Sequence, residues 1–407
     1  MRLAVISSSA PYGKGESFVI TEANALSEEA VDVLLIPTQL RPGNPNRFQL
    51  HERVSLLAQP SLSLSVVSAF FSLLIQSPAK VLSLFKLVTD TNIWNTVKNY
   101  LVLPKAIWLS KQLKQRNIEH IYAHWMTTSA TLAMVISRLT GIPWSCTAHR
   151  GDIVTNNLLE LKCQDASFVR FISISGVELA RARAKLNDSK VKILHMGVSV
   201  PPVTEQPKPS LVGASRSLFT ILCPANLIPV KGHKYLIEAM SKMKRAEKVR
   251  LLLAGDGELR EKLETQATKL GVAEKISFLG HVPHNNLITM YENKEVDLVV
   301  LPSLDLGNGI HEGIPVSLME AMSHQVPVIS TRTGGIPELL EDSMTGSEFG
   351  CLVTAGDSSV LAEEIDNMVG CESFCNYWAR SGLTRITENF NLEINTKRLV
   401  DLLSDRR

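Results

Sequence analysis

Two glutamates, Glu312 and Glu320, have the spacing in this 407-residue chain that most clearly indicates chemistry. We predict the start of a helix over residues 316–322, which puts Glu320 on the helix and Glu312 in the loop before it. Eight residues exceed two helical turns, so the carboxylates cannot meet at one point. A helix start offers free N–H groups and a positive dipole end, and both attract anions. The pair suits a ligand with a diphosphate between hydroxyl groups; two surface glutamates flanking a turn are the alternative.

A buried strand and a glycine turn follow this segment. The apolar run Val-Pro-Val-Ile at residues 326–329 lies between turn signals, which favours a parallel strand covered on both faces. Gly334 and Gly335 have no Cβ, so backbone there can approach a ligand closely. The order helix, strand, Gly-Gly turn and helix is typical of one unit of a doubly wound sheet.

These residues together resemble the donor-site signature of retaining GT-B-type glycosyltransferases of family four. The signature is carried by Glu312-Gly313-Ile314-Pro315, Glu320-Ala321-Met322, Pro327-Val328-Ile329 and Gly334-Gly335-Ile336-Pro337-Glu338. The resemblance extends over residues 219–368. The N-terminal half is similar, more loosely, to the exopolysaccharide and colanic-acid branch of that family.

The resemblance implies an α/β fold of GT-B architecture, in which two doubly wound parallel-sheet (Rossmann-like) domains face a cleft. It implies a retaining, hexosyltransferase-type reaction in surface polysaccharide biosynthesis, from a UDP- or GDP-sugar to a glycan or lipid-linked acceptor. No cofactor is implied. The sequence has no Asp-x-Asp metal motif, so we expect no metal ion and no dependence on cations.

Length and composition agree with two globular domains. A chain of 407 residues is too long for one core. Alternating strand and helix patterns predict a first domain at 1–202, with a helical insertion near 60–116, and a second domain at 203–378 after a proline-rich linker. The remaining residues, 379–407, contain a predicted last helix at about 389–405 that we expect to return to the first domain.

Charge and cysteine content exclude several classes of protein. A formal net charge of +2 argues against a dedicated nucleic-acid binder. Six scattered cysteines do not form a disulfide framework or a metal-ligand pattern, which favours reduced thiols in the cytoplasm. The N-terminus has a strand pattern rather than that of a secretion signal.

The loop after the strand at 218–223 carries Asn226, Lys231 and Gly232. A lysine beside a glycine just before a helix suits phosphate binding, although a solvated lysine is the alternative. The resemblance implies that Lys231 grips the diphosphate together with an arginine. Asn226 stands at the arginine position, which removes a charge and a bidentate donor and puts tight diphosphate binding, and with it activity, in doubt.

The resemblance also assigns the other donor contacts. Backbone near Val282 would pair with the nucleobase, and Glu320 would accept hydrogen bonds from the ribose hydroxyls. Glu312 would hold sugar hydroxyls or stabilise the oxocarbenium-like centre. The loop and helix start at Gly313, Ile314, Val316 and Ser317 would bind the phosphate, with the amides of the last two as its donors.

The first domain supplies further candidates. Gly13 and Gly15, in the loop after the first strand, allow close approach to a sugar or phosphate, although an ordinary turn is the alternative. His149 matches a histidine that the family places near the reacting sugar, so it is a candidate catalytic residue together with Glu312. His124 and Asp152 follow strands of this domain and are acceptor-side candidates.

The insertion indicates a second kind of partner. Residues 77–116 contain seven basic residues, one acid, Asp90, and four interleaved aromatic residues. The basic residues are Lys80, Lys86, Lys98, Lys105, Lys111, Lys114 and Arg116, and the aromatic residues are Phe85, Trp94, Tyr100 and Trp108. This composition suits an anionic membrane surface, here the inner face of the cytoplasmic membrane. A helical insertion packed on the domain, with solvated lysines, is the equal alternative.

Two other functions stay open. One is a sugar-nucleotide 2-epimerase on the same fold, which would need acid–base residues around the sugar and no acceptor groove. The other is a non-catalytic scaffold that binds a nucleotide sugar, and Asn226 motivates it.

Overall fold

The chain folds into two compact units, residues 1–196 with 392–407 and residues 197–391. The first division lies six residues before the boundary expected at 202, and the second lies thirteen residues after the boundary expected at 378. Most of the expected linker lies outside the described residues. The computed structural model describes residues 1–12, 16–44, 49–202, 218–307 and 309–405.

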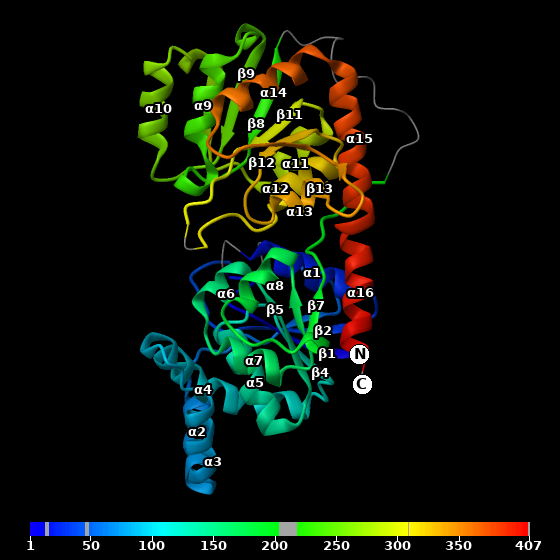
Figure 1. The fold of residues 1–407 in the computed structure, drawn as a ribbon. Helices are drawn as coiled ribbons and strands as arrows, with labels where there is room; N and C mark the ends of the chain where they lie inside the picture. The colour runs from blue at the N-terminus through cyan, green and yellow to red at the C-terminus, as the bar shows by residue number, and fades with distance from the viewer. Residues whose placement is uncertain (13–15, 45–48, 203–217, 308, 406–407) are drawn as a thin grey trace. The chain divides into compact units, whose positions relative to one another are not determined.

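A parallel sheet of seven strands forms the centre of the first unit, in the order β3-β2-β1-β4-β5-β6-β7 (Figure 1). The inner strands are short, buried runs, as expected for a sheet covered on both faces, whereas the edge strands β3 and β7 are more exposed. Val5 of β1 pairs with Leu35 on one side and with Tyr122 on the other. The chain direction across the sheet reverses between β1 and β4. The strands are β1 (Arg2–Ser7), β2 (Asp32–Pro37), β3 (Val54–Leu56), β4 (His120–Ala123), β5 (Trp144–Ala148), β6 (Val169–Phe171) and β7 (Val191–Ile193).

Helices pack against both faces of this sheet through two apolar clusters. One cluster joins α1 to the C-terminal helix α16 through residues such as Val19 and Leu399. The other joins α4 and α5 through residues such as Leu103 and Leu132. The helices of this unit are α1 (Ser17–Glu28), α2 (Leu64–Gln76), α3 (Pro78–Leu87), α4 (Ile93–Gln115), α5 (Thr128–Thr140), α6 (Arg150–Thr155), α7 (Leu159–Asp165), α8 (Ile174–Arg181) and α16 (Leu392–Ser404).

The second unit is built on a six-stranded parallel sheet in the order β10-β9-β8-β11-β12-β15. Its direction reverses between β8 and β11. A small antiparallel hairpin, β13 (Glu341–Asp342) with β14 (Ser347–Glu348), lies beside it. The sheet strands are β8 (Phe219–Cys223), β9 (Val249–Ala254), β10 (Ile276–Gly280), β11 (Leu298–Leu301), β12 (Val328–Thr331) and β15 (Cys351–Val353). The helices are α9 (His233–Lys242), α10 (Arg260–Lys269), α11 (His284–Glu292), α12 (Val316–Ser323), α13 (Ile336–Leu340), α14 (Ser358–Gly370) and α15 (Glu372–Asn389).

The end of the chain differs from the single last helix expected at about 389–405. The structure has two helices there: α15 ends at Asn389 in the second unit and α16 begins at Leu392 in the first. Between them the Phe390 carbonyl accepts a hydrogen bond from the Val198 N–H, at 2.9 Å. This backbone pairing belongs to the second unit, and the chain leaves that unit just after it.

The expected helical insertion consists of α2, α3 and α4, and here one surface prediction is wrong. Lys105 is fully buried, and its Nζ donates to the carbonyls of Pro37 at 2.7 Å and Thr38 at 3.0 Å. Burial lowers the pKa of Lys105 to about 8. Lys105 therefore stabilises the carboxyl end of β2 and takes no part in a charged surface.

The aromatic residues of the insertion also differ in exposure. Phe85, Tyr100 and Trp108 pack against the apolar cluster of α4 and α5. Trp94 is 72% exposed. Of the four aromatic residues predicted to face a membrane surface, only Trp94 is largely exposed.

Candidate functional site

The direction of the second unit's sheet reverses between β8 and β11, and open α/β sheets bind ligands above the carboxyl ends of the strands at such a point. The loops after these two strands lie against each other. The Leu304 N–H donates to the Val230 carbonyl at 2.8 Å. Gly232 has φ +69°, and a Cβ there would stand 1.9 Å from the Pro302 carbonyl oxygen. Only glycine fits this contact, so Gly232 brings the two loops together.

Lys231 and Glu312, predicted separately as diphosphate and sugar contacts, form an ion pair with each other. Lys231 ends the short 3₁₀ turn Pro229–Lys231, and Glu312 lies in the loop before α12. The Lys231 Nζ is 2.6 Å from Glu312 Oε1, with side-chain exposures of 19% and 14%. The pair spans the loops that follow β8 and β11. A half-buried lysine in this position can exchange its carboxylate partner for a phosphate.

The Gly-Gly turn has a different neighbour from the one expected. Gly334 has φ +58°, and a Cβ there would stand 2.0 Å from the Glu312 carbonyl oxygen. The Gly335 N–H donates to the same oxygen at 3.3 Å. The close approach predicted between this turn and a ligand is therefore made to the backbone of Glu312. The glycines place the Glu312 loop and do not themselves form an open binding surface.

Helix α12 begins at Val316, after Pro315 as its N-cap, as the sequence predicted. The first N–H groups of an α-helix have no partner inside the helix. Those of Val316 and Ser317 are such groups, while Gly313 and Ile314 lie half-buried in the loop before them. The Glu312 loop thus leads directly into a helix start that is suited to an anion.

Glu320 has a partner that the sequence analysis missed. His284, the first residue of α11, places its Nε2 2.7 Å from Glu320 Oε1. The hydrogen bond to Glu320 raises the pKa of His284 above its ordinary value of 6.5. Val282, predicted to pair with a nucleobase, is two residues before His284 in the loop after β10. The sequence did hold a signal for His284, because it follows β10 in the same segment as the candidate Val282.

Asn226, at the expected arginine position, is exposed in the loop after β8. Its carbonyl accepts the Ile228 N–H at 2.8 Å. The neighbouring turn is tight, because a Cβ on Gly255 would stand 2.0 Å from the Ala225 carbonyl oxygen. The backbone of the loop is therefore well fixed, and the exposed amide contributes no charge.

The corresponding reversal in the first unit lies between β1 and β4, and a buried glutamate joins the two loops. Glu16 accepts hydrogen bonds from the N–H groups of Ser8 at 3.0 Å and Ser9 at 2.6 Å. Glu16 Oε1, which accepts from Ser8, also accepts from Nε1–H of Trp125, after β4. Sequence reasoning missed both residues, although Trp125 directly follows His124. The candidates Gly13 and Gly15 lie outside the described residues.

His149 and His124 are brought together as part of a hydrogen-bonded chain. His149 Nε2 is 3.4 Å from His124 Nδ1, and the rings stack at 5.5 Å with 23° between their planes. His124 Nε2 is 3.0 Å from Glu22 Oε1, and Glu22 Oε2 accepts from Arg170 at 2.6 Å. Glu22, Arg170 and His124 are all buried. His124 is therefore an interior group, and its expected place on an open acceptor surface is wrong.

The charged groups of this chain influence one another. Burial raises the pKa of Glu22, but the charges of Arg170 and His124 outweigh it and hold that pKa far below its usual range. Ionised Glu22 can only accept, so His124 Nε2 carries a proton. Burial, and then the nearby His124 and Arg170, lower the pKa of His149 well below its ordinary value.

Asp152 also differs from its expected role. The side chain is buried, and its Oδ2 accepts the N–H groups of Met126 at 3.0 Å and His149 at 3.1 Å. Burial raises the pKa of Asp152 to about 6. The carboxylate ties the loop after β4 to the loop after β5. Asp152 is therefore a support for His149 and not an acceptor contact at the surface.

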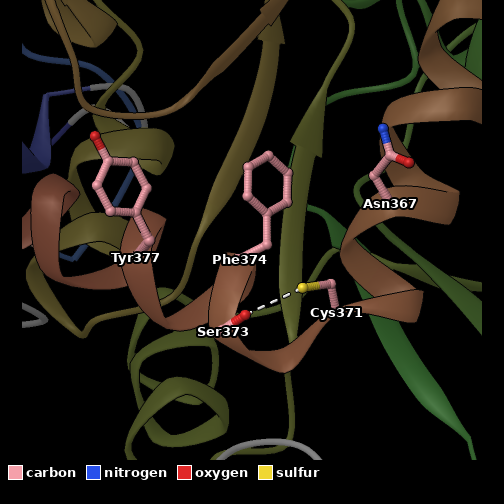
Figure 2. A pocket seen from close by; sticks show the side chains of 5 residues that line it. All are labelled: Asn367, Cys371, Ser373, Phe374 and Tyr377. Atoms are coloured by element: carbon pink, nitrogen blue, oxygen red, sulfur yellow. Dashed lines mark hydrogen bonds between the residues drawn. The ribbon is translucent and has the colours of Figure 1, made fainter.

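A hollow of about 420 Å³ in the second unit lies apart from these residues (Figure 2). Asn367 of α14 and Phe374 and Tyr377 of α15 line it, and Cys371 Sγ is 3.2 Å from Ser373 Oγ. Helix α14 starts after β15 and runs back along the sheet, so its end lies toward the amino ends of the strands. The hollow is therefore not part of the candidate site. Among the described residues, no group of three or more His, Cys, Asp or Glu side chains could hold a metal ion.

Comparisons with known proteins show which family and fold this chain resembles. Residues 213–385 match the family described as "Glycosyl transferases group 1". The chain is 28% identical over 271 residues to the phosphatidylinositol N-acetylglucosaminyltransferase gpi3 subunit of Schizosaccharomyces pombe, covering 64% of this chain and 57% of that protein. It is 25% identical over 325 residues to a GDP-mannose-dependent alpha-(1-6)-phosphatidylinositol monomannoside mannosyltransferase of Mycolicibacterium smegmatis, covering 75% of this chain and 82% of that protein.

A relative named for amylovoran biosynthesis agrees with the family branch expected from the sequence. The chain is 28% identical over 215 residues to the amylovoran biosynthesis glycosyltransferase AmsK of Erwinia amylovora, covering 53% of this chain and 50% of that protein. The chain thus spans about half the length of several curated relatives that it matches. Among solved structures, Anabaena HepE in complex with UDP and glucose superposes with a TM-score of 0.71 at 16% identity, over 99% of both chains. This likeness confirms the GT-B fold class.

Proposed function

Because residues 213–385 form a group 1 glycosyltransferase domain within a chain of GT-B fold, we propose that this protein is a retaining, hexosyltransferase-type glycosyltransferase. It moves a sugar from a UDP- or GDP-sugar to a glycan or lipid-linked acceptor, in the synthesis of a surface polysaccharide or glycolipid. The names of the relatives support the substrate classes, since they include a GDP-mannose-dependent enzyme and an amylovoran enzyme.

The observation that carries this proposal is the Lys231–Glu312 pair at the reversal between β8 and β11. Breaking the sugar–phosphate bond adds negative charge to the departing diphosphate. Lys231 and the amides of Val316 and Ser317 stabilise that charge from fixed positions, which is electrostatic catalysis. The diphosphate replaces Glu312 as the partner of Lys231. Glu312 is then free to hold sugar hydroxyls or to stabilise positive charge at the anomeric carbon.

Nucleotide recognition involves the neighbouring elements. Glu320 accepts hydrogen bonds from the ribose hydroxyls, in competition with His284, which holds one of its oxygens. Backbone near Val282 pairs with the base. His149 remains the candidate for contact with the reacting sugar, as the family resemblance implies.

We further propose that the reaction needs no metal and no cofactor, and that the protein is cytoplasmic. The motive for the first is the lysine and helix start, which supply the positive charge, together with a sequence that has no Asp-x-Asp motif. The motive for the second is the nucleotide-sugar donor and the pattern of free cysteines among the described residues.

The direct test is a turnover assay with a panel of UDP- and GDP-sugars and extracted lipid and glycan acceptors. We expect release of one nucleoside diphosphate that depends on acceptor, persists in EDTA, and falls by at least about tenfold in Glu312→Ala. The product anomer, assigned by NMR, should match the donor. Inversion of the anomer would overturn the retaining mechanism, and loss of turnover in EDTA would overturn metal independence.

A non-catalytic nucleotide-sugar binder is the second candidate, and exposed, uncharged Asn226 is the observation that favours it. Donor binding without turnover across the whole acceptor panel would support this reading. An epimerised nucleotide sugar in the same reaction mixtures would instead support a sugar-nucleotide 2-epimerase.

A further inference from the structure

The helical insertion of the first unit exposes an unusual amount of apolar surface. We call residues 62–101 the arm; it contains α2, α3 and the first part of α4. Leu64 is 90% exposed, Ile75 81% and Trp94 72%. Single exposed apolar residues are ordinary, whereas a group of this size marks a binding surface. The exposed large apolar residues of the arm are Leu62, Leu64, Phe71, Ile75, Leu82, Ile93, Trp94, Val97 and Leu101.

These residues form stripes rather than a scatter. In α2, Phe71 and Ile75 follow Leu64 by seven and eleven positions, which at 3.6 residues per turn returns to one face within about 20°. Val66 and Ala69 are buried on the opposite side of the same helix. Helix α2 therefore has two apolar faces, one packed on the unit and one open.

In the first part of helix α4, apolar side chains are exposed and polar side chains are buried, the reverse of an ordinary surface helix. Ile93, Trp94, Val97 and Leu101 lie within about 100° of one another around the axis and are exposed. The polar residues Asn95, Thr96 and Asn99 are buried on the other side. Polar residues normally face water and apolar residues the core. The outer face of the arm therefore matches an apolar environment better than water.

The charged residues of the arm and of the rest of α4 are almost all basic. Asp90 is the single acid between residues 54 and 116, and its carboxylate accepts the N–H groups of Asn92 at 2.7 Å and Leu158 at 2.8 Å. Asp90 thus holds the loop before α4. Among the described residues, none of the exposed basic side chains of this region forms an ion pair. They are Lys80, Lys86, Lys98, Lys111, Lys114 and Arg116.

Helices α2 and α3 of the arm are short and bent relative to each other. Within the part of the chain that the structure describes, no single helix is long and apolar enough to cross a bilayer. Helices α2 and α3 pass that test only as a pair, and they are bent by 114°. In Figure 1 they extend away from the layers that cover the sheet of the first unit. A bent, amphipathic element with basic neighbours is typical of a helix that lies in the membrane interface.

We propose that the arm docks the protein on an anionic phospholipid bilayer, with its exposed apolar side chains in the headgroup and acyl boundary. The basic residues attract the anionic lipid, and the apolar stripes provide the contact that salt does not screen. The proposal stands independently of the transfer reaction. Together with that reaction it implies a lipid-linked acceptor.

The test is flotation of the full chain with vesicles of phosphatidylglycerol and phosphatidylcholine, and with phosphatidylcholine alone. We expect binding to the anionic vesicles, weaker binding to the neutral ones, and incomplete release by salt. The variant Leu64→Ser/Phe71→Ser/Ile75→Ser should bind at least tenfold more weakly. Lys80→Gln/Lys86→Gln/Lys98→Gln should lose the preference for anionic lipid. These side chains are exposed, so the thermal unfolding temperature should stay unchanged.

A matched control replaces three exposed apolar residues outside the arm, Ile193→Ser/Leu270→Ser/Met344→Ser, and should float like the wild type. Failure of the wild type to float with anionic vesicles would overturn the proposal. So would unchanged binding of the triple-serine arm variant. If light scattering shows that the arm mediates a dimer which does not bind vesicles, a second copy is the occupant and the proposal is wrong. Donor hydrolysis in water should be equal in the wild type and the arm variant, which separates this test from that of the transfer reaction.

Discussion

The two sheet reversals of this molecule hold their charged groups in opposite ways. In the first unit Glu22, Arg170 and His124 are buried and bonded to one another. In the second unit Lys231–Glu312 and His284–Glu320 are partly exposed pairs. A buried charge that loses its partner is costly, whereas exposed pairs contribute little to stability. The first arrangement therefore fixes geometry, and the second can exchange partners with a ligand at low cost.

The largest effect is expected when the buried group of Glu22, Arg170 and His124 is broken. Arg170→Met leaves the Glu22 carboxylate buried without its main partner, and should lower the free energy of unfolding by about 3–5 kcal/mol. Urea denaturation measures it. The matched control is Arg181→Met, which removes an exposed pair with Asp188 and should cost at most about 1 kcal/mol. Equal losses in the two variants would contradict the contrast between buried and exposed pairs.

The next effect concerns Lys231. Lys231→Ala should weaken binding of a nucleoside diphosphate by about 10–150-fold, the equivalent of about 1.5–3 kcal/mol for a charged hydrogen bond. It also leaves Glu312 facing the diphosphate, so Lys231→Ala/Glu312→Gln should recover part of the affinity. Calorimetry measures both.

Lys234→Ala is the control for this loop. Lys234 lies on α9, 62% of its side chain is exposed, and its contact with Glu238 is long, at 3.9 Å. It should bind normally. Asn226→Arg should tighten diphosphate binding by restoring a bidentate cation. Wild-type affinity in Lys231→Ala would show that this loop does not hold the diphosphate.

Substitutions of Glu312 and of Glu320 should have different effects on nucleotide binding and turnover. Glu320→Ala removes the proposed ribose contact and should weaken nucleotide binding by about tenfold or more. Glu312→Ala should cut turnover and leave nucleotide affinity equal or higher, because it frees Lys231. Calorimetry and the turnover assay on both variants provide the comparison. If both variants bind the nucleotide and turn over like the wild type, the proposed roles of Glu312 and Glu320 are wrong.

The smallest effect is a pH dependence at His284. A raised pKa means that the charged pair with Glu320 is complete below 6.5 and is lost as the pH rises through the higher folded-state pKa. Glu320 is then released, so nucleotide affinity should rise with pH. The gain should be no more than about fivefold because His284 is largely exposed. His284→Asn should flatten the profile; an unchanged profile would show that the pair does not compete with the nucleotide.

The sequence predicted the elements better than their partners. Local pattern predicted a strand at 326–329, which the structure has at 328–331, and the start of helix α12. The resemblance directed attention to Lys231 and Glu312. Their contact was not predictable, because it depends on a sheet order that places the loops after β8 and β11 side by side. Arg170 within a buried strand is a signal for a buried acid, but the partner, Glu22, lies on a helix far away in the chain.

In the insertion the sequence did not separate exposed from buried residues. Basic and aromatic residues led us to predict a membrane surface there, yet Lys105 is in the core and only Trp94 of the four aromatic residues is largely exposed. Helix α4 buries asparagines and exposes aliphatic residues, so an amphipathic pattern assigns its faces the wrong way round. Which face of such a helix meets the protein depends on tertiary contacts, here the hydrogen bonds of Asn99 to Val88 and Asn157.

A crystal structure with a nucleoside diphosphate bound tests most directly whether Lys231 exchanges Glu312 for the ligand. The diphosphate should lie at the start of α12 and between the loops after β8 and β11. Lys231 Nζ should contact a phosphate oxygen, and Glu312 should no longer be its partner at 2.6 Å. A nucleotide bound elsewhere in the second unit, or an intact Lys231–Glu312 pair beside the bound diphosphate, would contradict it.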